Sequence, residues 1–136
     1  DLDPRRPNER MQSDVTAADY AALVRSSITT RQLADLLGRN PSRIRQRIQS
    51  GALYAFQPGS EWLIPCFQVN DGSLVPGIEK VVPHLRTDLH PLKVERWFLT
   101  PNPDLTDAAE TSVWAPREWL LTGGDPARVA GLAKHL

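Results

Sequence analysis

Side chains that can read DNA bases recur on one side of a predicted helix in the first half of the chain. Ile44 and Ile48 lie four residues apart, so we take them as the buried side of this helix. The opposite side combines arginine, whose planar fork matches guanine, with glutamine, which pairs with adenine; flanking arginines can hold phosphates. The residues predicted to contact DNA are Arg39, Ser42, Arg43, Arg45, Gln46, Arg47 and Gln49.

The positive charge of the chain is concentrated around this helix. The 136 residues carry 16 basic and 16 acidic side chains, a net charge of zero. Residues 25–50 nevertheless hold six arginines and a single acid, Asp35, which gives a net charge of +5. Such a cluster is either a solvated face without a ligand or a surface for phosphate groups. The helices and the hairpin predicted around the cluster decide between these two interpretations.

Strong start and stop signals place two short helices in this segment. Thr29 and Gln32 form a Thr-x-x-Gln capping box, and Gly38 ends the helix that follows. Asn40 can cap a second helix, with Pro41 at its first position, and Gly51 ends it. Two short helices joined by a turn that contains glycine are typical of a helix-turn-helix unit.

A β-hairpin is predicted directly after the second helix. Residues 53–56 form an apolar, aromatic run, residues 57–60 make a turn, and residues 62–64 lead to Pro65. A hairpin in this place is the wing of a winged helix-turn-helix. The sequence therefore favours DNA contact over a bare arginine face.

The rest of the chain divides around this unit. Residues 1–13 are predicted to be a flexible arm, and Thr16 can cap a helix that runs to about Arg25. We assign residues 14–69 to the winged helix-turn-helix domain, 70–77 to a linker and 78–136 to a helical interaction domain. In that last domain, Pro83 should shorten or distort the first helix, residues 100–112 are expected to be a loop, and Asp125 should cap the final helix. The fold class is mainly α with a small β-hairpin wing.

No catalytic or metal site is predicted. Cys66 is expected to be a buried structural thiol, and the three histidines lack the spacing of metal ligands. Gly123-Gly124 precedes a helix, but no lysine and serine of a phosphate-binding loop follow it. We expect no cofactor and no enzyme activity.

The chain also lacks the signals of a membrane or secreted protein. No apolar run approaches the ~20 residues that a membrane span needs. A single cysteine fits a reducing compartment. We therefore expect a cytoplasmic protein with no membrane partner.

The helix-turn-helix segment resembles the excisionase and MerR-like winged helix families. The matching residues are Thr29 to Gly38, then Pro41 to Gly51, then Leu53 and Trp62-Leu63-Ile64-Pro65. The resemblance implies DNA contact by the second helix and the wing.

The C-terminal half resembles the toxin-binding domain of Xre/MbcA/ParS-type antitoxins. The resemblance rests on Gly77-Ile78 with Val81, Val82 and Leu85, on Trp97 to Leu105, on Ala115 to Leu121 with Gly123, and on Val129 and Leu132-Ala133. It implies an antitoxin of a type II toxin–antitoxin system that binds operator DNA, represses its own operon and neutralises a protein toxin of the RES or PIN type. Three of the four tryptophans also fall in this half. The predicted toxin-binding residues are Trp97, Trp114, Arg117, Trp119, Leu120 and Arg128.

Two functions thus remain open from the sequence. The favoured one is the antitoxin, acting as a homodimer, because one short recognition helix contacts only a few base pairs and a small helical half gains stability from a partner. The alternative is a stand-alone DNA-binding regulator, or an excisionase-like factor, without a toxin.

Overall fold

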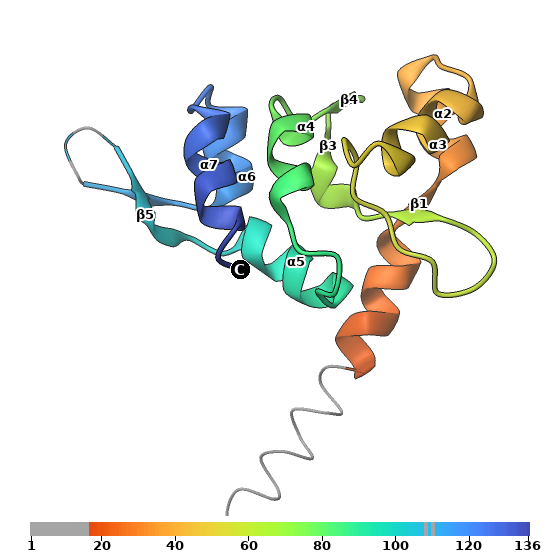
Figure 1. The fold of residues 1–136 in the computed structure, drawn as a ribbon, viewed down its shortest axis with the longest axis horizontal. Helices are drawn as coiled ribbons and strands as arrows, with labels where there is room; N and C mark the ends of the chain where they lie inside the picture. The colour runs from red at the N-terminus through yellow and green to blue at the C-terminus, as the bar shows by residue number, and fades with distance from the viewer. Residues whose placement is uncertain (1–16, 108, 110) are drawn as a thin grey trace, which may run out of the picture.

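The computed structural model describes residues 17–107, 109 and 111–136. The predicted arm (residues 1–13) and the predicted cap Thr16 lie outside these residues. The protein is mainly helical, with small antiparallel strand pairs (Figure 1). Figure 1 shows helices α2 and α3 at one end, helices α6 and α7 at the other, and helices α4 and α5 between them.

The two predicted helices of the arginine-rich segment are confirmed. Helix α2 (Thr30–Leu37) begins at a complete capping box, in which Thr29 accepts from the Gln32 amide and Gln32 accepts from the Thr29 amide. It ends at Gly38, whose φ of 66° is the left-handed conformation that glycine adopts without strain. Helix α3 (Pro41–Gln49) follows after a three-residue turn and is capped by the side chain of Asn40.

The predicted hairpin after α3 is present in shortened form. Only Phe56 pairs with Leu63, through two backbone hydrogen bonds of 3.0 and 2.8 Å, where a strand over residues 53–56 was expected. Strand β2 (Leu63–Ile64) then pairs antiparallel with strand β1 (Ile28–Thr29), which leads into α2. The Phe56–Leu63 hairpin is therefore tied to the start of the two-helix unit.

A second hairpin lies inside the expected linker, residues 70–77. Strand β3 (Val69–Asn70) pairs with strand β4 (Ser73–Leu74), and the two residues between them, Asp71 and Gly72, both have positive φ. Positive φ at both central positions is what a tight type I′ hairpin turn requires. This segment therefore has a defined structure of its own.

The C-terminal helices follow the sequence prediction closely. Helix α4 (Ile78–Val81) passes into a 3-10 turn, η2 (Val82–His84), at Pro83, as expected. Helices α5 (Pro91–Leu99), α6 (Pro116–Leu121) and α7 (Pro126–Ala133) each begin with proline at the first position. Asp125 caps α7 by accepting from the Ala127 amide, as predicted.

The expected loop over residues 100–112 is wrong. Strand β5 (Asn102–Thr106) occupies much of it and pairs antiparallel with strand β6 (Val113–Trp114). Pro103 lies inside this strand, at an exposed position where the missing N–H costs little. The β5–β6 pair extends away from the helices beside α6 and α7 (Figure 1).

Two hydrophobic cores organise these elements, and they meet at residues 67–69. The α2–α3 core consists of Leu33, Ala34, Ile44, Leu53 and Ile64. The C-terminal core is larger and consists of Phe67, Val75, Ile78, Val81, Val82, Leu89, Val94, Phe98, Leu105, Leu120, Val129 and Ala133. Phe67 stacks on Phe98 of α5 at 4.5 Å between ring centroids, so the C-terminal core begins before the expected linker.

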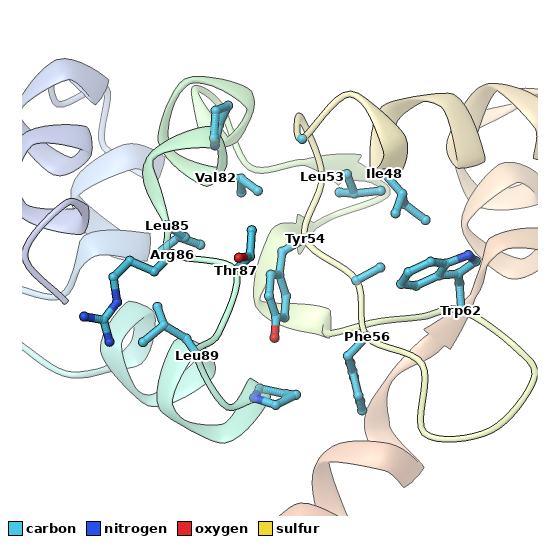
Figure 2. Close-up of a pocket in the computed structure, with 14 residues that line it drawn as sticks. Ile48, Leu53, Tyr54, Phe56, Trp62, Val82, Leu85, Arg86, Thr87 and Leu89 are labelled. Atoms are coloured by element: carbon cyan, nitrogen blue, oxygen red, sulfur yellow. The ribbon is translucent and has the colours of Figure 1, made fainter.

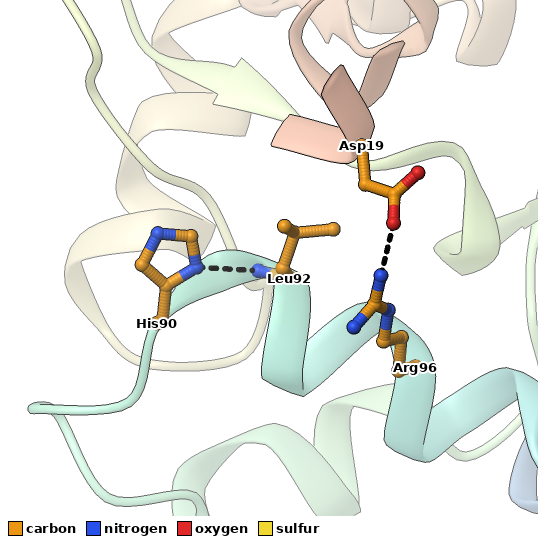
Figure 3. Close-up of polar contacts among 4 residues, drawn as sticks. All are labelled: Asp19, His90, Leu92 and Arg96. Atoms are coloured by element: carbon orange, nitrogen blue, oxygen red, sulfur yellow. Dashed lines mark hydrogen bonds and ion pairs between the residues drawn. The ribbon is translucent and has the colours of Figure 1, made fainter. Parts of the chain in front are cut away.

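The helix over described residues 17–26 packs against the start of α5. Leu23 lies in a small apolar cluster with Phe56 and Leu92, and Tyr20 meets the edge of His90 at 5.2 Å. Asp19 pairs with Arg96 of α5 (Figure 3). His90 in turn caps α5, because its Nδ1 accepts from the Leu92 amide at 3.1 Å.

An arginine side chain joins α6 to the chain that leaves the α2–α3 unit. Arg117 donates from Nε to the carbonyl of Phe67 and from a terminal nitrogen to the carbonyl of Val69, both at 2.8 Å. Hydrogen bonds from charged groups are the stronger ones, and an unpaired carbonyl in a half-buried place is costly.

We expect Arg117→Ala to lower the free energy of unfolding by about 2–3 kcal/mol, because it removes both hydrogen bonds. Arg117→Lys, which can restore one of them, should fall between this variant and the unchanged protein. The exposed Arg86→Ala is the matched control and should stay within about 0.5 kcal/mol. Urea unfolding followed by circular dichroism measures all three, and equal losses for Arg117→Ala and Arg86→Ala would contradict the assignment.

Candidate nucleic-acid interface

Helix α3 has one buried side and one open side. Ile44 is fully buried in the α2–α3 core, and Ile48 packs against the same core while half-buried. Of the seven residues predicted to contact DNA, six are exposed and Arg47 is half-buried. The structure therefore gathers Arg39, Ser42, Arg43, Arg45, Gln46 and Gln49 at one end of the molecule, along α3 and at its start.

The arginines of this segment are available for an external ligand. Within the part of the chain that the structure describes, the side chains of Arg39, Arg43, Arg45 and Arg47 form no ion pair or hydrogen bond. A guanidinium without a protein partner keeps its five donors for phosphate or for a base edge. This is the electrostatic requirement of a DNA-contacting surface.

Ser42 differs from its neighbours. Its hydroxyl donates to the side-chain oxygen of Asn40 at 3.0 Å, and its amide donates to the same atom. The hydroxyl proton is therefore engaged in the cap of α3, and Ser42 can offer only its acceptor lone pairs outward.

The Phe56–Leu63 hairpin adds little charge to this surface. Its loop, residues 57–61, is exposed and contains one acid, Glu61, and no basic residue. The positive charge near α3 thus comes from the two-helix unit alone.

The predicted toxin-binding residues are largely engaged inside the protein. Leu120 is 1% exposed and belongs to the C-terminal core, so its prediction as a contact residue is wrong. Arg117 is half-buried, and two of its nitrogens are bound to the carbonyls of Phe67 and Val69. Trp119 donates to the Asp125 carbonyl, and Arg128 donates to the Asp104 carbonyl and lies over the Trp119 ring.

The other two tryptophans keep part of their surface. Trp97 and Trp114 are half-buried against the C-terminal core. Among the described residues, the large apolar side chains that stay exposed are Leu36, Leu99 and Val113, and the last two belong to this half. Leu99 and Val113 were not among the predicted toxin-binding residues, of which Arg128 is exposed and Trp97, Trp114 and Trp119 are half-buried.

Cys66 is exposed, contrary to the expected buried thiol. It lies in the 3-10 turn η1 (Cys66–Gln68), and its thiol donates to the carbonyl of Ser26 at 2.6 Å. Local desolvation, and then the nearby Glu95, raise the pKa of this thiol, which disfavours the thiolate. Glu95 is itself desolvated, which raises its pKa. These shifts do not favour a nucleophile.

Sequence reasoning missed an apolar cleft between the hairpin and the start of α5. Tyr54, Phe56 and Trp62 contribute its aromatic wall, and these residues were interpreted only as a wing. No sequence signal marks the cleft, because its opposite wall comes from residues 82–91.

Two further searches gave no candidate site. No group of three or more acidic, histidine or cysteine side chains that could hold a metal ion occurs among the described residues. None of the described helices is long and apolar enough to cross a membrane.

No family model and no curated protein matches this chain. Among solved structures, it is similar to one described as the NMR structure of Rv2175c. The two share 24% sequence identity and superpose with a TM-score of 0.54 over 80% of this chain and 79% of the other. This likeness concerns the fold alone.

The cap of α3 gives a testable consequence for the interface. We expect Asn40→Ala to lower the free energy of unfolding by about 1 kcal/mol, because the Ser42 amide loses its acceptor. Asn40→Ser, which preserves a capping oxygen, is the matched control, and its free energy of unfolding should fall by only a few tenths of a kcal/mol. Thermal unfolding measures both variants, and equal melting temperatures for Ala and Ser would show that the cap contributes nothing.

Proposed function

We propose that this chain is a DNA-binding regulator in which α2 and α3 act as a helix-turn-helix and the Phe56–Leu63 hairpin as a short wing. The observation that carries the proposal is the open side of α3, where Arg43 and Gln46 can read bases while neighbouring arginines pair with no side chain that the structure describes. The buried Ile44 on the opposite side fixes which residues face outward.

The place of each residue around α3 separates those proposed to contact bases from those proposed to contact phosphates. Arg43 and Gln46 lie on the side away from the line through Ile44 and Ile48, where a helix in the major groove presents residues to base edges. Arg45 and Arg47 lie on the flanks, where they can reach the phosphates on either side of the groove. The acidic loop of the hairpin suits a wing that borders the groove without gripping the backbone.

A homodimer on DNA is part of this proposal. Helix α3 is nine residues long, so a single copy reads only a few base pairs. A second copy related by two-fold symmetry would double the contacts and explain how so short a reader gains affinity.

The proposal is tested by binding to DNA from upstream of the gene and to sequences selected from a random library. We expect Arg43→Ala and Gln46→Ala to relax base preference at a cost of about 1–3 kcal/mol each. Arg45→Ala and Arg47→Ala should weaken binding to all sequences alike and flatten the salt dependence. Gel shifts at several salt concentrations separate the two classes.

The control for these variants is Lys134→Ala, which removes one exposed positive charge from the C-terminal end. If all four α3 variants bind like Lys134→Ala, α3 is not the reader. Ser42→Ala should have a smaller effect on base preference than Gln46→Ala, since the Ser42 proton is held by Asn40.

An antitoxin role is the second candidate function. The exposed Leu99 and Val113, together with half-buried Trp97 and Trp114, favour a protein partner for the C-terminal half. Large exposed apolar side chains near aromatic ones are typical of interface anchors. Neutralisation through the buried Leu120 is excluded from this candidate.

The test uses the whole chain, because the C-terminal core includes Phe67. A variant with Arg43, Arg45 and Arg47 changed to Ala is expressed beside the product of the neighbouring gene, and growth and co-purification are measured. Under the antitoxin candidate this variant restores growth, whereas adding Leu99→Asp and Val113→Asp abolishes rescue. Absence of both binding and rescue, with folded protein present, leaves the stand-alone regulator.

A further inference from the structure

A cleft of about 500 Å³ lies between the Phe56–Leu63 hairpin and the segment that connects α4 to α5. Its volume falls in the range of pockets that hold small molecules. Figure 2 shows Tyr54 in the middle of the cleft, with Leu85, Thr87 and Leu89 on one side and Phe56 and Trp62 on the other. Both walls thus contribute large side chains to one space.

The lining has the chemistry of a site for a flat apolar molecule. Three aromatic side chains and several aliphatic ones supply surfaces on which a planar ring can stack. The polar groups in the lining side chains are few: the hydroxyls of Tyr54 and Thr87, the Trp62 indole N–H and the guanidinium of Arg86. Arg86 is the one charged residue among those that line the cleft.

Tyr54 is fixed through hydrogen bonds to its backbone. The buried side chain of Gln68 accepts from the Tyr54 amide and donates to the Tyr54 carbonyl, both at 2.8 Å. The Tyr54 hydroxyl makes no hydrogen bond to any residue that the structure describes. Burial raises the pKa of Tyr54 to about 12, so the hydroxyl stays protonated and can donate to an acceptor.

Arg86 is available to receive a negative charge. Its only ion pair with a described residue is the one to Asp88 at 3.3 Å, and both side chains are more than half exposed. Exposed pairs of this kind are worth little, so an anion at the edge of the cleft can replace Asp88 at small cost.

We propose that this cleft binds a small aromatic acid, whose ring lies between Tyr54 and Leu89 and whose anionic group is held by Arg86 at the edge of the cleft beside Leu89 (Figure 2). The Tyr54 hydroxyl donates to an acceptor on the same molecule. A neutral analogue binds more weakly, because it lacks the charge that Arg86 meets.

The cleft also touches the helix that carries the DNA-contacting face. Ile48 of α3 lies beside Trp62 in its wall (Figure 2). A molecule bound against Tyr54 packs on the segment that joins α3 to the hairpin, so it can favour one arrangement of these two elements. This regulatory consequence rests on the proposed DNA-binding function, whereas the binding site itself does not.

The binding site is tested by calorimetry without DNA. The probes are three aromatic anions of increasing size: indole-3-acetate, 2-naphthoate and 8-anilinonaphthalene-1-sulfonate, with indole-3-acetamide as the neutral partner of the first. We expect saturable binding of at least one anion to the intact protein. Arg86→Ala should weaken it about fivefold, as expected for one ion pair at an exposed edge.

Two variants make the result specific. Thr87→Trp fills the cleft from an exposed position and should abolish binding, with circular dichroism confirming that the protein is folded. Lys80→Ala removes an exposed charge that does not line the cleft, and its binding should match the intact protein.

Either of two outcomes overturns the site: no probe binds the intact protein up to about 1 mM, or a folded Thr87→Trp binds as the intact protein does. A change of oligomeric state in Thr87→Trp would instead make the cleft a protein contact, which also overturns it. Where a probe binds, gel shifts at saturation test the coupling to DNA. Unchanged DNA affinity there overturns the coupling and leaves the DNA-binding proposal to its own α3 variants.

Discussion

One buried amide side chain, that of Gln68, fixes the chain at the place where the α2–α3 core meets the C-terminal core. Gln68 is 0% exposed, and it satisfies both the N–H and the C=O of Tyr54, fourteen residues away. A buried primary amide is tolerated only when its polar atoms are paired, so moving the backbone at Tyr54 would break both hydrogen bonds and leave buried polar groups without their partners. Phe67, next to it, enters the C-terminal core, and Arg117 of α6 binds the carbonyls on either side of Gln68. The chain that follows the α2–α3 unit is therefore fixed at residues 67–69 by contacts with Tyr54, with the C-terminal core and with α6.

Local rules of sequence explain the parts of the fold that were predicted well. The capping box at Thr29, the stop at Gly38 and the prolines that begin α3, α5, α6 and α7 depend on residues within one turn of each other. The pairs β1–β2 and β5–β6 were missed because they depend on contacts that such rules do not contain, whereas β3–β4 was missed although Asp71-Gly72 is a local hairpin-turn signal. Strands β3 and β4 are two residues each, too short for an alternating pattern, and β5 contains Pro103 and Asp104, which disfavour a strand wherever pairing does not impose it.

The candidate site shows the same limit. The face of α3 follows from helical periodicity once Ile44 is taken as buried, and the structure places six of its seven predicted residues in solvent. Arg117 and Arg43 are indistinguishable in sequence, since each lies in a short helix that begins with proline. Only the nearby carbonyls of Phe67 and Val69 make the first of them structural. Leu120 and Cys66 were misplaced for a related reason, because burial is decided by elements far away in the sequence.

The positive and negative charges lie in different segments of the chain even though the net charge is zero. Residues 25–50 carry a net charge of +5 and residues 51–136 a net charge of −3, and α3 lies at the opposite end from α6 and α7 (Figure 1). The electric field of a polyanion orients a neutral protein whose charges are separated before the two come into contact. The positively charged end that carries α3 would therefore face the polyanion. The hairpin loop with Glu61 does not strengthen this attraction, which leaves the two-helix unit as its source. Ile48 lies on the inner side of α3 and in the wall of the cleft, so the helix proposed to meet DNA also forms part of the cleft wall.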